Sequence, residues 1–120
     1  MTYIESFVLS VPRANLDAYT REALKAAAVW KEHGALSYTE AVGDDAPMGT
    51  LTSYPQALQL REGEIAVIGM AVYPDRATRD VANKATMSDP RMGEMMASMK
   101  KLGVAFDRTF FGGFAVIVEA

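Results

Sequence analysis

The sequence predicts an α+β fold of the ferredoxin-like kind, in which the elements follow the order β-α-β-β-α-β. Strand-like and helix-like apolar patterns alternate in that order along residues 1–120, with no repeat or linker, so we predict a single domain. The third and the last strand-like segments are apolar on both faces, although the helices of this arrangement cover only one face of the sheet. A second copy can cover the other face, so we predict a homodimer that closes a dimeric α/β barrel.

The composition excludes several classes of function. The net charge is −3 and no run of Lys or Arg is present, so we expect no nucleic-acid partner. The absence of cysteine excludes disulfides, thiol nucleophiles, thiolate zinc sites and iron–sulfur clusters. No apolar run approaches the ~20 residues that a membrane span needs, and no basic region followed by an apolar run opens the chain. We therefore expect a cytoplasmic protein with no membrane partner.

The first strand is predicted over Tyr3–Val11, where neither face is plainly polar, and a proline ends it. A helical pattern then runs from about Arg13 to His33, with Asn15 as the expected N-cap. Gly34 fits the left-handed position that often follows a helix. The predicted buried stripe of this helix consists of Leu16, Tyr19, Ala23, Ala27 and Trp30.

His33 is the only histidine, which excludes a Ser-His pair or a multi-histidine metal site within one subunit. It lies in the last turn of the predicted helix, where exposed backbone carbonyls favour positive charge. We therefore expect a capping or solvent-exposed role for its side chain.

The second strand is predicted over Ala35–Val42, and a long connection rich in glycine, proline and aspartate follows over residues 43–63. A connection of this length is usually functional or an arm that packs on a neighbour. Within it, Ala57–Leu60 is expected to form a short accessory strand. Asp44 and Asp45 are better explained as turn formers than as ligands of a hard cation, because they lack the spacing of a calcium loop.

The third strand, Ile65–Tyr73, has nine residues without a charge, which is typical of a strand covered on both faces. A proline ends it, and Asp75 is the expected cap of the next helix. Arg79 and Asn83 lie one turn apart at the edge of that helix's apolar face, where they either point along the sheet surface or form a solvated flank. The face predicted to lie on the sheet consists of Thr78, Val81, Ala82 and Ala85.

The next helix is predicted to begin with Asp89 as its N-cap and Pro90 at its first position. A stripe of methionines follows at helical spacing, and it consists of Met92, Met95, Met96 and Met99. We interpret the stripe as apolar core, with a pliable ligand lining or a soft-metal site as alternatives. No cysteine or nearby histidine joins the methionines, so we assign no metal ligand.

The last strand is predicted over Thr109–Glu119 and is again apolar on both faces. The adjacent Gly112 and Gly113 mark either a bulge or a close approach of another backbone. This strand and the long connection are the elements that we expect the two subunits to exchange.

Seven short motifs carry a further signal. They are Phe7 through Val11-Pro12, Lys31-Glu32-x-Gly34-Ala35-Leu36-x-Tyr38-x-Glu40, Gly43-Asp44-Asp45-x-Pro47-x-Gly49, Tyr73-Pro74, Arg79-Asp80-x-x-Asn83, Met87-x-Asp89-Pro90-Arg91-Met92 and Gly112-Gly113-Phe114. Together they resemble the YbaA-like family of small bacterial domains of unknown function. The resemblance implies the dimeric α/β-barrel form of the ferredoxin-like fold and no established reaction. The chain departs from the family pattern at Met70 and Val72, where relatives tend to carry Trp and Glu.

Analogy with cofactor-independent oxygenases and isomerases that share this barrel suggests an enzyme whose substrate lies between the sheet and the helices. We hypothesise such an enzyme, with no cofactor and a small apolar or aromatic ligand. Carboxylates on apolar strands have raised pKa values that suit base catalysis, and Arg and Asn side chains can hold a developing enolate. The predicted catalytic residues are Tyr38, Glu40, Arg79 and Asn83, and the predicted substrate-binding residues are Tyr3, Glu5, Trp30, Met92 and Met96.

Two alternatives are open from the sequence. In the first, Glu40 and Arg79 form an ordinary ion pair and the tyrosines belong to the core. In the second, the chain is a non-catalytic module that binds a small molecule or serves as a dimeric scaffold. Catalysis needs two or more polar groups that converge in one concave site, whereas a binder needs only the apolar pocket.

Overall fold

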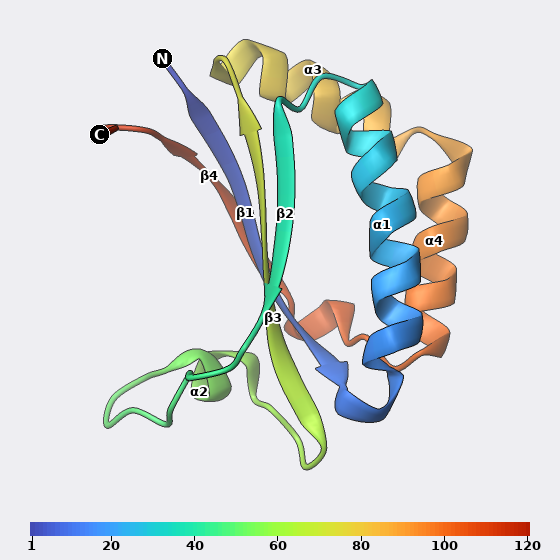
Figure 1. Ribbon diagram of the computed structural model, residues 1–120, viewed down its shortest axis with the longest axis vertical. Coiled ribbons are helices and arrows are strands. Elements are labelled where there is room, and N and C mark those ends of the chain that lie inside the picture. Colours follow the sequence, from blue (N-terminus) through green and yellow to red (C-terminus); the bar gives the residue numbers. More distant parts are fainter.

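The computed structural model describes all 120 residues and contains a four-stranded sheet packed on helices (Figure 1). The strands are β1 (Tyr3–Pro12), β2 (Ser37–Val42), β3 (Glu64–Tyr73) and β4 (Phe110–Ala115). Their spatial order is β2-β3-β1-β4, and every neighbouring pair is antiparallel. This order, with helices in both crossover connections, confirms the ferredoxin-like fold predicted from the sequence.

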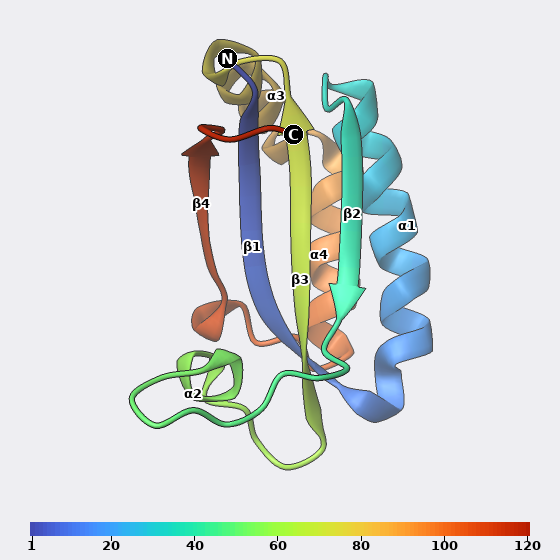
Figure 2. The ribbon, with the colours of Figure 1, turned by 60° about the vertical axis from the view of Figure 1, so that its left-hand side comes forward.

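Three helices cover one face of the sheet, namely α1 (Leu16–Glu32), α3 (Arg76–Met87) and α4 (Pro90–Lys101) (Figures 1 and 2). None of the helices combines the length and hydrophobicity that a membrane crossing requires. The short helix α2 (Tyr54–Leu58) lies with the long connection on the other side, at one end of the sheet.

The accessory strand predicted over Ala57–Leu60 is wrong, because α2 and its cap occupy that segment. Ser53 starts this helix, and its Oγ accepts a hydrogen bond from the backbone N–H of Gln56 (3.2 Å). A proline stands in the first turn. These are start signals of a helix, and they outweigh the short apolar alternation on which the strand prediction rested.

The helix ends follow the sequence with one exception. The carboxylates of Asp75 and Asp89 accept backbone hydrogen bonds from the first turns of α3 (2.7 Å) and α4 (3.0 Å), which confirms both caps. Gly34 adopts the predicted positive φ, +128°. The N-cap role of Asn15 is wrong, because its side chain donates instead to the carbonyl of Leu102 (2.7 Å). That bond joins the start of α1 to the end of α4.

The main core lies between α1, α4 and the sheet, and the methionine stripe is part of it. Met92, Met95 and Met99 are buried there, and Met96 packs against them from the edge. The interpretation of the stripe as core is therefore confirmed.

The predicted faces of the other two helices need correction. α1 buries Ala26 and Val29 rather than Ala27, because a stripe stepped by four residues drifts off a face that repeats every 3.6 residues. α3 buries Ala82 and Thr86, whereas Val81 is 70% exposed.

β4 is shorter than predicted and ends at Ala115 rather than Glu119. Its only partner, β1, begins at Tyr3, so the chain beyond β4 has no strand with which to pair. A single backbone hydrogen bond continues the pairing, from the N–H of Val116 to the carbonyl of Thr2 (3.0 Å).

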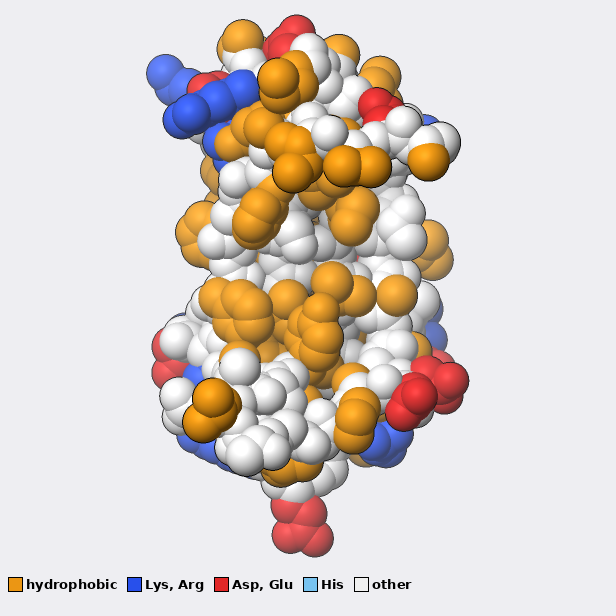
Figure 3. Space-filling view, turned by 90° about the vertical axis from the view of Figure 1, so that its left-hand side faces the viewer, with side chains coloured by type: hydrophobic (Ala, Val, Ile, Leu, Met, Phe, Trp, Pro, Cys, Tyr) orange, Lys and Arg blue, Asp and Glu red, His pale blue; other side chains and the backbone are white.

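The sheet face that the three long helices leave uncovered is largely apolar. Cross-strand rows on this face are Phe114–Ile4–Val72, Gly112–Ser6–Met70 and Phe110–Val8–Ile68. Figure 3 shows hydrophobic side chains gathered in an upper and a lower group on this side, with backbone and other side chains between them. Phe114 is 60% exposed and Phe110 is 42% exposed, so both faces of the sheet carry apolar residues, as predicted.

Candidate functional site

The strand residues of the predicted site point toward the helices. Side chains alternate along each strand, and β1 residues such as Tyr3 and Leu9 pack in core clusters with helix residues. The strand register then sets two neighbouring rows on this face, Glu5–Ala71–Tyr38 and Phe7–Gly69–Glu40.

Arg79 reaches from α3 to the sheet and forms the Arg79 cluster with Tyr3 and Glu5. Its Nη1 donates to Glu5 Oε2 at 2.6 Å, its Nη2 donates to Tyr3 Oη at 3.2 Å, and its guanidinium carbon lies 4.8 Å from the Tyr3 ring centre. The side chains of Arg79 and Glu5 are only 13% and 11% exposed. Asp80 meets the outer side of the guanidinium at 2.9 Å. The solvated-flank alternative is therefore wrong for Arg79.

Gly113 of β4 makes room for the Arg79 cluster. A Cβ at this position would lie 2.5 Å from Tyr3 Oη and 2.8 Å from Arg79 Nη1. The pairing of β4 with β1 is unbroken there, with Gly113 directly opposite Glu5, so the two glycines form no bulge. The atoms that approach Gly113 belong to side chains and not to another backbone, so neither role predicted for the glycines is correct.

Glu40 of β2 forms the Glu40 cluster with two tyrosines. Tyr38 donates its hydroxyl hydrogen bond to Glu40 Oε2 at 2.8 Å, and Tyr19 of α1 donates to Oε1. Burial, followed by the nearby charge of Glu40, raises the pKa of both tyrosines well above its usual range. Both hydroxyls are therefore protonated at neutral pH, and they hold the carboxylate between two fixed donors.

A cavity of about 150 Å³ opens beside the Glu40 cluster, between α1, β2 and β3. Its walls are mostly apolar, with Ala23, Val42 and Val67 among them, while Tyr19 and Glu40 supply polar groups. Small-molecule sites usually combine an apolar lining with a few polar groups in this way. A larger groove of about 410 Å³ lies between α1 and α4 and contains none of the predicted site residues.

The ordinary ion pair between Glu40 and Arg79, considered as an alternative, is wrong, because each side chain binds a different partner. The two clusters lie on the same side of the sheet. Within their shared row, Glu5 and Tyr38 stand two strands apart, which is about 10 Å between Cα positions. The site therefore has two polar centres instead of the single centre expected from the sequence.

The other predicted site residues divide between this region and the core. Trp30 stacks on Tyr38, with ring centres 6.5 Å apart and planes inclined by 17°. Asn83 lies half-buried on α3, one turn after Arg79, and its Oδ1 has no hydrogen-bond partner. Met92 and Met96 belong to the main core under α4 and join neither polar cluster.

Two tyrosines of this region are absent from the site residues predicted from the sequence. The sequence places Tyr19 only in the buried stripe of α1. Tyr73 is fully buried and its hydroxyl has no partner, and burial together with the charge of Glu5 raises its pKa to about 12. The available signal was the hydroxyl itself, because a tyrosine on a buried face needs a polar partner.

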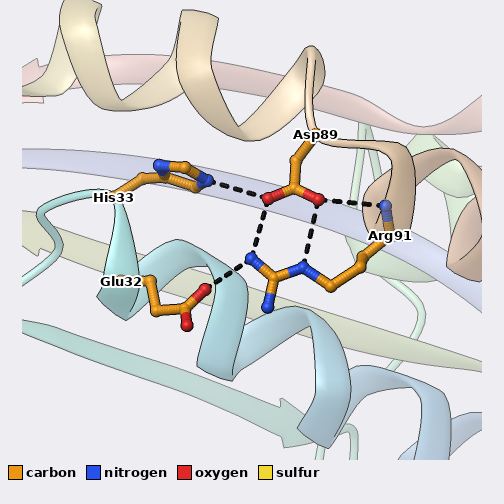
Figure 4. Close-up of polar contacts among 4 residues, drawn as sticks. All are labelled: Glu32, His33, Asp89 and Arg91. Atoms are coloured by element: carbon orange, nitrogen blue, oxygen red, sulfur yellow. Dashed lines mark hydrogen bonds and ion pairs between the residues drawn. The ribbon is translucent and has the colours of Figure 1, made fainter.

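His33 belongs to a separate polar network (Figure 4). Its Nε2 lies 3.0 Å from Asp89 Oδ2, and Arg91 donates to both oxygens of Asp89 (3.1 and 2.8 Å) and to Glu32 (2.5 Å). The bonds from Arg91 and His33 hold the pKa of Asp89 well below its usual range. Of the two roles expected for His33, the capping position is confirmed, because His33 is the C-cap residue of α1. The solvent-exposed role is wrong, because its side chain binds Asp89 in a network that joins the end of α1 to the start of α4. No group of three or more His, Asp or Glu side chains is arranged to hold a metal ion.

Solved structures share the fold at low sequence identity. A variant of SnoaB, a cofactor-independent oxygenase from Streptomyces nogalater, matches with a TM-score of 0.64 and 13% identity over 98% of this chain and 95% of that chain. A dimeric ferredoxin-like protein from an uncultured marine organism matches with a TM-score of 0.64 and 15% identity over the whole of both chains. These likenesses show the fold alone.

Sequence comparison identifies the family. The chain is 40% identical over 119 residues to "Uncharacterized protein YbaA" of Escherichia coli K12, and the match covers 99% of both chains. A protein of the same name from Shigella flexneri matches to the same extent. Residues 2–107 match the model of the family described as "Protein of unknown function (DUF1428)". This confirms the resemblance seen in the motifs, and the chain belongs to the DUF1428 family.

Proposed function

We propose that this chain is a cofactor-independent enzyme of the oxygenase or isomerase type, with its site between the sheet and the helices and with Glu40 as its general base. The observation that carries the proposal is the carboxylate of Glu40, fixed by two tyrosine hydroxyls at the wall of an apolar cavity. The fold shared with a cofactor-independent oxygenase supports the reaction class by analogy.

The chemistry follows from this arrangement. A carboxylate can remove a proton from an activated C–H or O–H group and leave a delocalised anion on the substrate. An isomerase returns that proton to a different carbon atom. An oxygenase lets the anion reduce molecular oxygen, which then serves as co-substrate and electron acceptor. Tyr19 and Tyr38, fixed in place by Glu40, set the direction from which the base approaches.

Proton abstraction is tested with two probes. We would measure deuterium uptake from solvent into 2,4-pentanedione by NMR, and oxygen consumption with 1,4-dihydroxynaphthalene by electrode, each against the rate in buffer. Glu40→Gln removes the base, so we expect the rate above buffer to fall about 10²–10⁴-fold. Glu62→Gln, a change at an exposed residue, is the matched control. A rate that falls equally in both variants, or no rate above buffer, would reject the enzyme.

We also propose that the uncovered sheet face binds a second copy of the chain. β1 and β3 have ten residues each and β2 and β4 have six each, so the sheet face covers roughly 500 Å² before side-chain relief is counted. Stable interfaces bury about 800 Å² on each partner, which this face and the adjoining α2 segment approach. An apolar surface of this size is unusual on a soluble monomer.

Native mass spectrometry and light scattering test the dimer at micromolar concentration. The unmodified chain is expected at twice the mass of one chain. Phe114→Glu puts a charge on the uncovered face and should give monomers, whereas Leu24→Glu, at a 67% exposed position on α1, should leave the dimer intact. A monomeric parent would reject the proposal, and bound mass in the spectrum would identify a ligand class.

A further inference from the structure

The Glu40 cavity, which is the cavity of about 150 Å³ beside the Glu40 cluster, has polar side chains of one kind only. Tyr19, Thr20 and Glu40 are the polar residues of its wall, and an ionised carboxylate can only accept hydrogen bonds. Tyr19 donates its hydroxyl proton to Glu40 Oε1, and Thr20 Oγ1 donates to the carbonyl of Leu16 at 2.8 Å. Because both hydroxyl protons are already used, these side chains offer a ligand lone pairs and no donor.

The tyrosines keep the Glu40 cavity in this state. Burial, followed by the charge of Glu40, raises the pKa of Tyr19 and Tyr38 well above its usual range, so both hydroxyls keep their protons at neutral pH. Each oxygen of Glu40 binds one tyrosine, and a carboxylate can accept about four hydrogen bonds. A ligand that donates can therefore join the cluster without displacing either tyrosine.

The charge at the cavity wall disfavours an anionic ligand. Glu5 and Glu64 are paired with arginines at 2.6 and 2.7 Å, whereas the side chains that bind Glu40 are two neutral hydroxyls. No Lys, Arg or His contributes to the wall, so the site carries the negative charge of Glu40 alone. A carboxylate ligand would be repelled, whereas an ammonium group would form a charge-assisted hydrogen bond.

The volume of the Glu40 cavity limits the body of the ligand. About 150 Å³ is the size of an engineered protein cavity that binds one benzene molecule. Ala23 and Val67 are buried and form apolar parts of the wall, so a ring can make van der Waals contacts with them. A second fused ring would have to extend through the opening, where it would gain few contacts.

We propose that the Glu40 cavity binds a single-ring molecule that carries a hydrogen-bond donor, either an ammonium or a hydroxyl group, and no negative charge. The donor group binds Glu40, and the ring fills the apolar part of the cavity. This inference rests on the proposed function in taking the Glu40 cavity as the ligand site, and it names the class of substrate. The larger probe 1,4-dihydroxynaphthalene would place one of its two rings in the cavity.

Four probes with one ring and one substituent carbon test the ligand class by NMR titration. Benzylamine is a charged donor at neutral pH, benzyl alcohol is a neutral donor, benzonitrile only accepts and benzoate is an anion. We expect benzylamine to bind with a Kd on the order of 1 mM, benzyl alcohol about threefold more weakly, and benzonitrile and benzoate about tenfold more weakly or worse. Benzonitrile or benzoate that binds as tightly as benzylamine, or benzylamine that does not bind, would overturn the proposal.

The amine 1-naphthylmethylamine tests the size limit. It has the same ammonium group as benzylamine and one further ring, which would strengthen binding about tenfold or more if it were buried. We expect its Kd to lie within about threefold of that of benzylamine, because the second ring stays in the opening. A complex that is tenfold tighter, or about tenfold, would overturn the single-ring assignment.

Variants locate the binding. Glu40→Gln removes the charge and keeps the shape, so benzylamine should bind about tenfold more weakly and lose its advantage over benzyl alcohol. Val42→Phe, at a 44% exposed position of the wall, takes up cavity volume and should weaken both probes alike. Glu62→Gln, a change at an exposed residue outside the cavity, is the matched control and should leave each Kd unchanged. Benzylamine binding that survives both cavity variants would come from the acidic surface and would overturn the proposal.

The two proposals fail in different ways. Benzylamine binding that depends on Glu40, with neither 2,4-pentanedione nor 1,4-dihydroxynaphthalene turned over, would retain the ligand class and reject the enzyme. Turnover that depends on Glu40, with benzonitrile bound as tightly as benzylamine or with no benzylamine bound, would retain the enzyme and reject the ligand class.

Discussion

Gly69 of β3 is the position at which one methyl group should disturb the candidate site most directly. The ring of Phe7 lies over this glycine, and a Cβ at position 69 would come within 1.9 Å of Phe7 Cζ. The ring also lies 6.4 Å from that of Tyr38, so its displacement would reach the Glu40 cluster. Gly69→Ala therefore forces either the ring or the strand to move.

The magnitude follows from two opposing effects. Replacing a strand glycine by alanine normally stabilises by about 0.5–1 kcal/mol, whereas overpacking costs about 1–3 kcal/mol and occasionally more. At 1.9 Å the overlap is severe, so we expect an overpacking cost of about 2–4 kcal/mol, which leaves a net loss of about 1–3 kcal/mol after the gain from alanine is subtracted. For 120 residues the unfolding entropy is about 0.25 kcal/mol/K, so the unfolding temperature should fall by roughly 4–12 °C.

The assay is thermal unfolding followed by circular dichroism at one fixed protein concentration, since a dimer makes the midpoint depend on concentration. In a Phe7→Ala background the overlap is gone, and Gly69→Ala should then stabilise. Gly93→Ala is the matched control, because its Cβ would meet nothing within 4 Å. A Gly69→Ala chain as stable as the parent, or a coupling to Phe7 below about 0.5 kcal/mol, would refute the packing argument.

Two further predictions concern ion pairs away from the site. Arg108 donates to both oxygens of Glu64 (2.9 and 2.7 Å) and to the carbonyls of Leu58 and Gln59 (3.1 and 2.8 Å). Arg108→Met should therefore lower the free energy of unfolding, measured in urea, by about 2–4 kcal/mol, and adding Glu64→Gln to this variant should restore part of the loss. A loss below about 0.5 kcal/mol would contradict this prediction. Folding lowers the pKa of Glu64, through Arg108, and it lowers the pKa of Asp89, through Arg91 and His33. Both carboxylates therefore contribute to the stability of the fold above about pH 4, and this contribution is lost as the pH falls below that value. The unfolding temperature should therefore fall between about pH 5 and pH 2, and less steeply in Asp89→Asn; equal slopes would contradict the role of Asp89.

The sequence by itself determined the order of the elements and most of their ends. The uncharged run of Ile65–Tyr73, the caps at Asp75 and Asp89 and the glycine at position 34 act over a few residues, so their effect can be derived from local rules. The apolar character of both sheet faces also follows from the sequence, because side chains alternate between the two faces along a strand. The same local rules failed at Ala57–Leu60, where a serine cap and a proline favoured a helix over the strand.

Only the tertiary structure decided which polar groups meet. Glu40 lies two residues from Tyr38, yet its other partner, Tyr19, comes from a different element, and Arg79 binds Glu5 across 74 residues of sequence. The strand register and the placement of α3 over β1 fix these partners, and neither follows from spacing along the chain. For the same reason, the unpaired hydroxyl of Tyr73 could be found only once its neighbours were known.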